Sequence, residues 1–289
     1  MKLKMIFNPA AGRGRARRRI DGVVSYLRDR GGEVDVHESA SPRDLTSVAA
    51  ESSRGGYDRV VVCGGDGTVN LAIREFDLQR GTLAVIPSGS GDDFARVAGV
   101  PLKWEHACQA VLAGAVREVD VALANGTRFV CIAGLGFDSE VTAFANSSAK
   151  YLRGSAIYLY SILRVLPRFR PYRMSLRIDG VERTERIMMV VVGNSPQYGG
   201  GIRIVPAARI DDSLLDFCIV HETSRLTLLK TLPRVFNGSH VRSPYVETGR
   251  GREFHFQSER PLAVFADGEM VAETPVTIGF AAEKLKLVV

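Results

Sequence analysis

The chain reads RVVVCGGDGTVN at residues 59–70, where a valine-rich run leads through three glycines into a helix-forming segment. Glycine adopts backbone conformations that other residues avoid, so this loop can bring its backbone close to a ligand. The helix that follows would present free N–H groups and a partial positive charge, which suit a phosphate group. Asp66 is a candidate for holding Mg²⁺ directly or through water. The plainer alternative is a tight turn in which Asp66 caps the helix at the surface.

The residues around this stretch alternate between strand-like and helix-like segments. Strand-like segments lie at residues 3–8, 33–37, 59–63 and 82–87, and those at 59–63 and 82–87 are rich in Val, Ile and Leu. Helical periodicity is found at residues 16–30 and about 42–53, with Ser41 as an N-cap, and further helices start at about Thr68 and Asp92. This β-α-β-α order predicts an α/β domain with a Rossmann-like, three-layer parallel sheet.

Two further glycine-containing loops follow strands of the same predicted sheet. Asn8-Pro9-Ala10-Ala11-Gly12 follows the first strand, and PSGSGDDFAR at residues 87–96 follows the fourth. The carboxyl ends of parallel strands open at one edge of the sheet, where ligands bind in such folds. Each loop alone would be an ordinary strand-to-helix turn, whereas the three together favour a nucleotide-binding site. None is a P-loop, because the required lysine and glycine spacing are missing.

The alternation of strands and helices stops near Glu118. Beyond it, short alternating strands are separated by turn signals, and Asp179-Gly180 and Asp267-Gly268 are expected as hairpin turns. Residues 139–167 are the exception, because their pattern is helical. The second half of the chain is therefore predicted to form a mainly antiparallel β-sandwich.

The length of 289 residues suits two domains of ordinary size. We place the boundary near residue 122, with an α/β domain at 1–122 and a β-rich domain at 123–289, and whether the last strand returns to the first domain stays open. No apolar run approaches the roughly 20 residues that span a bilayer, and no secretory signal is expected. The cysteines lie far apart without metal-ligand spacing, which predicts buried, reduced thiols in a cytoplasmic protein. They are Cys63, Cys108, Cys131 and Cys218.

Basic residues are concentrated in two stretches of the chain, which has a net charge of +6. Five arginines lie between residues 13 and 19, and residues 150–177 contain seven basic residues and no acidic one. The second stretch also contains Tyr151, Tyr158, Tyr160, Phe169 and Tyr172. It is either a peripheral contact with an anionic membrane at its inner face or an interdomain helix with a solvated basic side. Nucleic-acid binding is disfavoured, because no recognised module accompanies the charge.

The three loop motifs resemble the nucleotide-site motifs of the diacylglycerol kinase catalytic family, whose relatives include sphingosine and ceramide kinases. Later strings at residues 192–220, VGNSPQYGGGIRIVPAARIDDSLLDFCIV, and at 265–270, FADGEM, are similar to further motifs of that family in the same order. GGDGT is shared with NAD kinases, which have a similar three-layer domain, and the later strings separate the lipid kinases from them.

The resemblance implies that ATP is the phosphate donor and that Mg²⁺ is required. The residues implied to contact ATP are Asn8, Pro9, Ala10, Ala11, Gly12, Ser39, Gly65, Asp66, Gly67, Thr68, Asn70, Ser90 and Asp93. The resemblance also implies that three carboxylates gather around the catalytic Mg²⁺, namely Asp66, Asp93 and Asp120. It further implies a catalytic role for Asp66.

The resemblance also assigns roles in the second domain. Glu269 would be the general base that deprotonates the lipid hydroxyl, with Asp267 as the competing candidate. Asp212 would hold a structural Mg²⁺ together with the carbonyl groups of Arg209 and Leu214. Two positions depart from the family pattern, since Asp92 replaces an Asn and Ser213 replaces a Gly.

The sequence therefore predicts an ATP-dependent lipid kinase that phosphorylates a hydroxyl of a lipid such as diacylglycerol. The alternatives are an NAD kinase-like or other small-molecule kinase and a non-catalytic nucleotide or lipid sensor. The identity of the lipid and the oligomeric state, including a homodimer, stay open.

Overall fold

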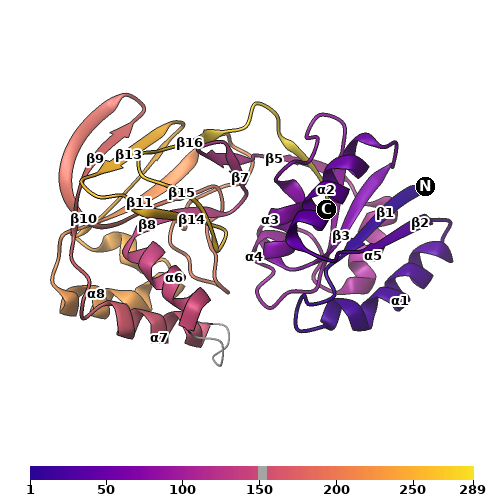
Figure 1. The fold of residues 1–289 in the computed structure, drawn as a ribbon, viewed down its shortest axis with the longest axis horizontal. Coiled ribbons are helices and arrows are strands. Elements are labelled where there is room, and N and C mark those ends of the chain that lie inside the picture. Colours follow the sequence, from indigo (N-terminus) through magenta and orange to yellow (C-terminus); the bar gives the residue numbers. More distant parts are fainter. Residues whose placement is uncertain (149–154) are drawn as a thin grey trace. The chain divides into compact units, whose positions relative to one another are not determined.

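The computed structural model describes residues 1–148 and 155–289, and it divides into two compact units (Figure 1). The first unit comprises residues 1–121 and 282–289, and the second comprises residues 122–281. The C-terminal segment thus returns to the first unit. The second unit therefore ends at residue 281, whereas the β-rich domain was expected to extend to residue 289. Lys150 and Tyr151 of the basic stretch lie outside the described residues.

The first unit is built on a six-stranded sheet in the order β2-β1-β3-β4-β17-β5. The five strands from β2 to β17 run parallel, and β5 pairs antiparallel with β17, so the predicted parallel sheet is confirmed. The strand bounds are β1 Lys2–Phe7, β2 Glu33–Glu38, β3 Arg59–Gly64, β4 Thr82–Pro87, β5 Val116–Val119 and β17 Leu285–Val288.

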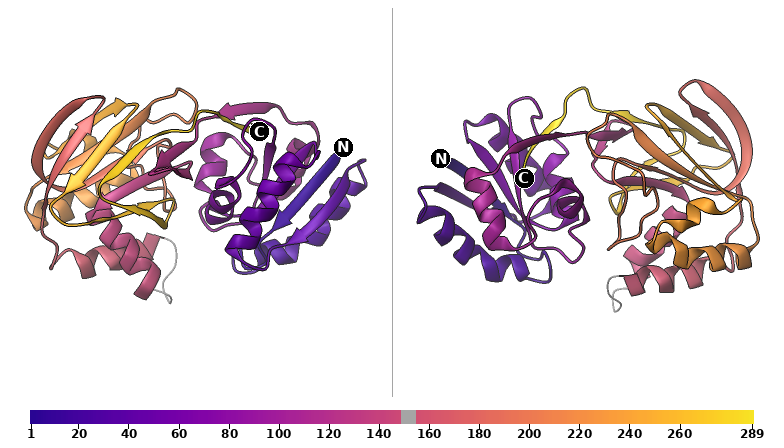
Figure 2. Two further views of the ribbon diagram at one scale, coloured as in Figure 1. Left: turned by 45° about the horizontal axis from the view of Figure 1, so that its top comes forward. Right: turned by 180° about the vertical axis from the view of Figure 1, so that it is seen from behind.

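Helices cover both faces of this sheet because its strands are apolar on both sides (Figure 2). Leu3, Met5 and Phe7 of β1 share one buried cluster with α1 (Arg15–Arg28) and α5 (Trp104–Ala113). Alternate residues of a strand point to opposite faces, and α2 (Pro42–Arg54) packs on the other side of β1 and β3, beside α3 (Asp66–Ile73). A short helix, α4 (Asp93–Ala98), follows β4.

Two predicted helix starts in this unit can be compared with the structure. The Ser41 hydroxyl accepts a hydrogen bond from the Asp44 amide at 3.1 Å, which confirms Ser41 as the N-cap of α2. Helix α3 begins at Asp66, two residues before the expected Thr68, so the glycine-rich loop passes directly into the helix.

The second unit is an antiparallel β-sandwich, as predicted. Its strands pair in the order β15-β14-β8-β10-β9-β13-β16-β6-β7, with β11 paired to β10 and β12 to β11. Their bounds are β6 Ala122–Ala124, β7 Thr127–Phe129, β8 Ile132–Gly136, β9 Tyr172–Ile178, β10 Val181–Gly193, β11 Leu215–His221, β12 Val246–Gly251, β13 Phe254–Ser258, β14 Ala263–Ala266, β15 Glu269–Glu273 and β16 Val276–Phe280. Both Asp-Gly pairs turn hairpins with positive φ at Asp and Gly, as a two-residue type I′ turn requires.

Helices gather at one end of the sandwich (Figure 1). They are α6 Phe137–Ser148, α7 Ser155–Val165, α8 Arg225–Thr231 and the 3₁₀ helices η1 Leu232–Phe236 and η2 Ser239–Arg242. Two of them, α6 and α7, correspond to the helical segment expected at 139–167. Within the described residues, every helix is too short or too polar to cross a bilayer.

Candidate functional site

The three glycine-containing loops meet at the carboxyl edge of the first sheet. The loops cover residues 8–14, 64–66 and 88–92 and follow β1, β3 and β4. The Ser88 amide donates to the Gly64 carbonyl at 2.8 Å, and the Asn8 amide donates to the Cys63 carbonyl at 3.3 Å. The parallel strands therefore bring together three loops that are dispersed over more than eighty residues of sequence.

Glycine is required where these loops touch. A Cβ atom on Gly12, whose φ is +56°, would overlap the Ser88 carbonyl oxygen. A Cβ atom on Gly65 would lie 2.7 Å from the Cα atom of Gly89. The loops thus pack backbone against backbone, and this leaves their amides close enough to one another to surround one ligand.

Two arginines of α1 fix the third loop in place, a role that the sequence did not reveal. Arg15 donates from Nη1 to the Gly89 carbonyl at 2.9 Å, and Arg19 donates to the Pro87 carbonyl at 3.4 Å. They are four residues apart and so lie on one side of the helix. That spacing was the available signal, but nothing local indicated which loop they would reach.

Three carboxyl groups lie together beside these loops. Asp66 accepts a hydrogen bond from the Phe94 amide at 3.0 Å, and Asp92 accepts one from the Gly89 amide at 2.9 Å. Burial, together with the negative charge of Asp93, raises the pKa of Asp66 to about 6. Burial also raises the pKa of Asp92. A cation would relieve this repulsion, so the donor set suits a hard ion such as Mg²⁺.

Within the described residues, no group of three or more His, Cys, Asp or Glu side chains is arranged to hold a metal by itself. A magnesium ion at Asp66 and Asp93 would therefore need phosphate or water oxygens to complete its coordination, as in other phosphoryl-transfer sites.

The remaining predicted residues of the first unit differ in their surroundings. Asp120 is buried and pairs at 2.8 Å with Lys284, which belongs to the returning C-terminal segment. The Ser39 hydroxyl donates to the Phe7 carbonyl at 3.2 Å, directly before the first loop. Ser90 is exposed, whereas Thr68 and Asn70 are buried in α3.

In the second unit, the Asp267-Gly268-Glu269 turn separates the two competing carboxylates. Asp267 accepts hydrogen bonds from the amides of Val130, Cys131 and Ile132 at 2.9–3.0 Å. Glu269 is exposed at the start of β15. The Asp267 carboxylate therefore joins the end of β14 to residues 130–132, the last of which begins β8, whereas the Glu269 carboxylate faces solvent.

Around Asp212, two carboxylates lie close to the guanidinium group of Arg250. The Asp212 carboxylate accepts from the Leu214 amide at 3.2 Å and lies 3.9 Å from Arg250. Arg250 also approaches Asp216 at 3.3 Å, and the second oxygen of Asp216 is buried with no hydrogen-bond partner among the described residues. Such oxygens suit a hard cation, but the arginine already supplies positive charge there. Ser213 adopts φ +57°, a left-handed conformation that glycine adopts more readily than serine.

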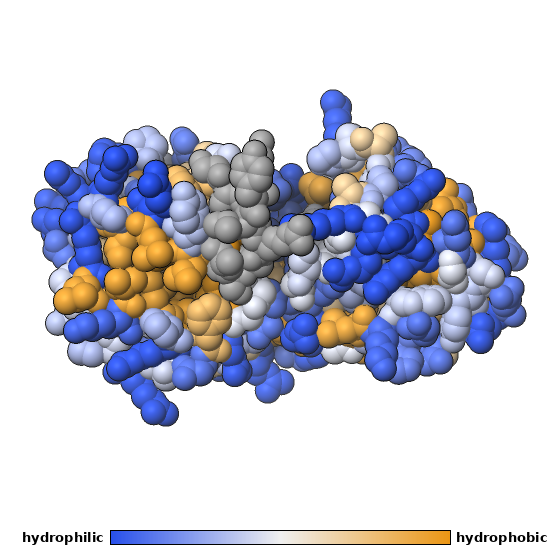
Figure 3. Space-filling view, turned by 90° about the horizontal axis from the view of Figure 1, so that it is seen from below, coloured by the Kyte–Doolittle hydropathy of each residue, from blue (hydrophilic) through white to orange (hydrophobic). Residues whose placement is uncertain are grey.

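The helical end of the second unit encloses an apolar cavity of about 560 Å³. Side chains from α6, α7, α8, η1, η2 and strands β10 to β12 line it, and most are aliphatic or aromatic. Apolar side chains also gather on the surface of this end (Figure 3). Volume and lining match a site for an apolar ligand. The sequence did not predict this cavity, because its lining comes from segments far apart in the chain.

Among the polar side chains of the lining are a carboxyl group and a phenol that form a hydrogen bond. Asp138, at the start of α6, accepts a hydrogen bond from the Tyr198 hydroxyl. Burial raises the pKa of Asp138. Tyr198 precedes the glycine run noted in the sequence, so that motif positions a side chain on the cavity.

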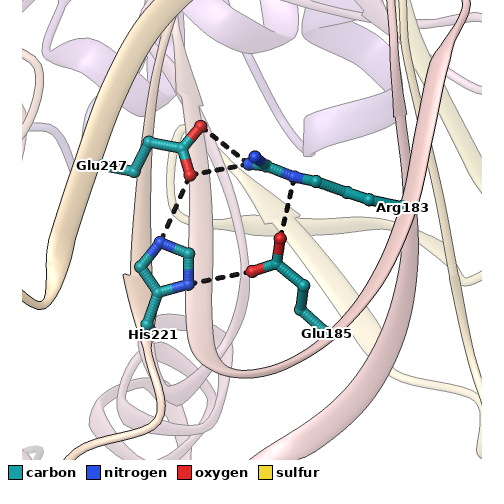
Figure 4. Close-up of polar contacts among 4 residues, drawn as sticks. All are labelled: Arg183, Glu185, His221 and Glu247. Carbon is teal, nitrogen blue, oxygen red and sulfur yellow. Dashed lines mark hydrogen bonds and ion pairs between the residues drawn. The ribbon is translucent and has the colours of Figure 1, made fainter.

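A separate cluster of ionisable side chains in this unit is a closed ring rather than a reactive site (Figure 4). Arg183 contacts Glu185 at 3.2 Å and Glu247 at 2.7 Å, and the two nitrogens of His221 face the same two carboxylates at 3.0 and 3.2 Å. Each acidic group therefore has two partners. The ring ties β10, β11 and β12 together.

Glycine-rich loops on a parallel sheet, together with a β-sandwich that holds an apolar cavity, are the features expected of a two-domain lipid kinase. Residues 2–124 match the diacylglycerol kinase catalytic domain, and residues 131–289 match the YegS C-terminal NAD kinase beta sandwich-like domain. The chain belongs to the diacylglycerol kinase and YegS-like lipid kinase family.

Individual relatives agree with this assignment. The chain is 32% identical to a diacylglycerol kinase of Mycobacterium tuberculosis, over 99% of this chain and 94% of the relative. It is 30% identical to a protein of Chromohalobacter salexigens named "Probable lipid kinase YegS-like", over 86% and 81% of the two chains. A crystal structure of a diacylglycerol kinase from Bacillus anthracis superposes with a TM-score of 0.80 at 28% identity, covering 99% of this chain and 96% of that one.

Proposed function

We propose that the protein transfers the γ-phosphate of Mg-ATP to a hydroxyl group of a lipid such as diacylglycerol. The observation that carries this proposal is the apolar cavity of the second unit. Its mostly aliphatic and aromatic lining suits an acyl chain and offers few hydrogen-bond partners to a polar, soluble acceptor. Membership of a lipid kinase family supports it.

In this proposal the first unit binds the nucleotide. Amides of the three loops and the N-terminus of α3 contact the phosphates, since helix N-termini and glycine-rich backbone favour anions. Asp66 and Asp93 hold Mg²⁺, which would neutralise charge on the transferring phosphate. Arg15 and Arg19 keep the third loop in position through their hydrogen bonds to its backbone carbonyl groups.

The second unit supplies the acceptor and the base. The cavity holds the apolar part of the lipid, and Glu269 removes the proton from its hydroxyl. Asp267 holds the turn that presents Glu269, because its carboxylate is occupied by three backbone amides.

The first experiment measures transfer of labelled γ-phosphate from Mg-ATP to a panel of lipids in mixed micelles, with NAD among the acceptors. Glu269→Gln should abolish transfer to lipid, whereas Glu273→Gln, an exposed glutamate at the other end of the same strand, should leave it unchanged. Ile162→Trp, which fills the cavity, should lower transfer to long-chain lipids.

The outcomes separate the candidate functions. Labelled NADP would favour an NAD kinase instead. ATP binding without transfer to any acceptor would favour a nucleotide or lipid sensor. Equal activity of the Glu269 and Glu273 variants would exclude Glu269 as the base.

A further inference from the structure

Exposed apolar side chains of the second unit are concentrated on one face. Of the nine large hydrophobic residues that are exposed in the described part of this unit, seven belong to α7, α8, η1 and the residue directly before β12. Leu226 is 60% exposed, Leu159 55%, Phe236 52% and Leu163 51%. Figure 3 shows apolar side chains gathered at this end. The members of this α7–α8 face are Leu159, Tyr160, Leu163, Leu226, Leu229, Phe236 and Tyr245.

The cavity opens on the same face. Leu159, Leu229, Phe236 and Tyr245 line the cavity and are also exposed to solvent. A ligand that enters between them would come directly from whatever covers the α7–α8 face. Exposed apolar patches of this kind mark interaction sites.

The charge around this face has one sign. Residues 155–170 and 224–245, which contain α7, α8 and both 3₁₀ helices, include seven arginine or lysine residues and no aspartate or glutamate. All seven basic side chains are exposed. They are Arg164, Arg168, Arg170, Arg225, Lys230, Arg234 and Arg242. Exposed leucines with a basic rim complement an anionic lipid surface, in which headgroup phosphates surround an apolar interior.

We propose that the α7–α8 face docks on an anionic lipid bilayer. The exposed leucines and Phe236 insert among the acyl chains, and the basic residues contact headgroup phosphates. A lipid then passes from the bilayer into the cavity through the opening at Leu159 and Phe236. This inference rests on the proposed lipid kinase function. It extends the membrane contact that the sequence predicted for residues 150–177 to α8 and η1, for which the sequence predicted no such contact.

The test uses two leucines that are exposed but do not line the cavity. Leu163→Glu with Leu226→Glu places two negative charges on the face and leaves the lining of the cavity intact. The control is Val181→Glu, because Val181 is 72% exposed on the hairpin turn between β9 and β10. Circular dichroism and thermal unfolding confirm that each variant is folded.

Binding is measured by sedimentation with vesicles of phosphatidylglycerol and phosphatidylcholine, without nucleotide. The wild type and Val181→Glu should bind mixed vesicles and bind pure phosphatidylcholine much more weakly, and the double variant should lose at least tenfold in affinity. Arg164→Gln and Arg234→Gln should each weaken binding about fivefold, as expected for one basic residue at an anionic surface. Equal binding of the double variant and the wild type, or no binding of the wild type, would overturn the proposal.

A second measurement separates docking from catalysis. With a monomeric short-chain diacylglycerol in solution, the double variant should phosphorylate as fast as the wild type, while transfer to long-chain lipid in vesicles should fall at least tenfold. Equal loss with both substrates would overturn the docking role, because it would show a damaged active site. If no lipid is phosphorylated at all, the kinase proposal fails, and the vesicle-binding result still decides the docking proposal.

Discussion

Replacement of Asp66 by asparagine tests the carboxyl cluster at the nucleotide loops. Asp66 has its Oδ1 atom 3.0 Å from the Phe94 amide, and an asparagine oxygen can accept the same hydrogen bond. The substitution therefore removes a charge while it keeps the shape and the main contact. In a chelating buffer, we expect Asp66→Asn to be more stable than the wild type at neutral pH.

The magnitude follows from the pKa. Burial and the charge of Asp93 raise the pKa of Asp66 from 3.8 to about 6. Each pKa unit corresponds to about 1.4 kcal/mol, so the ionised carboxylate lowers the free energy of unfolding by up to about 3 kcal/mol. Because the folded-state pKa of this acid is raised, the loss is absent below about pH 4, grows between about pH 4 and 6, and is complete above about pH 6.

The assay is urea unfolding of both proteins with EDTA, from pH 4 to pH 8. The stability difference should be close to zero at pH 4 and reach about 1–3 kcal/mol at pH 7.5 in favour of the variant. Addition of Mg²⁺ with a non-hydrolysable ATP analogue should then stabilise the wild type more than the variant, because only the wild type keeps the carboxylate. A variant that is equally stable or less stable at pH 7.5, or a difference that does not change with pH, would refute the reasoning.

Three further predictions concern other parts of the chain. Gly12→Ala should weaken binding of an ATP analogue at least tenfold, as measured by calorimetry. The control is Gly31→Ala, which should leave binding unchanged, because Gly31 also has a positive φ but no atom within 4 Å of its Cβ position. Equal effects of the two variants would show that close backbone packing at Gly12 is not required for binding. His221→Ala should lower the free energy of unfolding by about 1–2 kcal/mol, because Glu185 and Glu247 each lose one of their two partners. The control is Arg186→Ala, which breaks the exposed pair with Glu222 and should change the free energy of unfolding by less than about 0.5 kcal/mol. Arg250→Met should destabilise the second unit by about 1–3 kcal/mol at pH 7.5 and by less at pH 5; a loss independent of pH would show that its ion pairs with the acidic cluster are not the cause.

The local pattern of the sequence was sufficient for most of the fold. Valine-rich runs and helical periodicity identified the parallel sheet and its helices, because backbone preference and burial repeat every two or 3.6 residues. Asp-Gly pairs identified the hairpins for an equally local reason, since these residues tolerate positive φ. The three loops at the carboxyl edge of the sheet were found from their glycines, and their meeting followed from the geometry of any parallel sheet.

The sequence was less informative about the role of individual charged side chains. The partner of Asp120 is one example, because Lys284 lies more than 160 residues further along the chain and no local pattern indicated the pair. The sequence left Asp267 and Glu269 as competing candidates, and only the structure shows that the amides of residues 130–132 bind Asp267. A carboxylate has the same local signal whether it binds an amide, a lysine or a metal, so its partner decides its role.

What the sequence determined by itself is thus the α/β and β-sandwich architecture, the position of the three glycine-containing loops and the resemblance to lipid kinases. Only the tertiary structure decided that β17 returns to the first sheet, that Arg15 and Arg19 hold the third loop, and that α6, α7 and α8 enclose an apolar cavity with an exposed apolar rim. The physical reason is the distance in sequence between the interacting residues. Periodicity and turn chemistry depend on neighbours in the chain, whereas a cavity or an ion pair depends on which distant segments pack together.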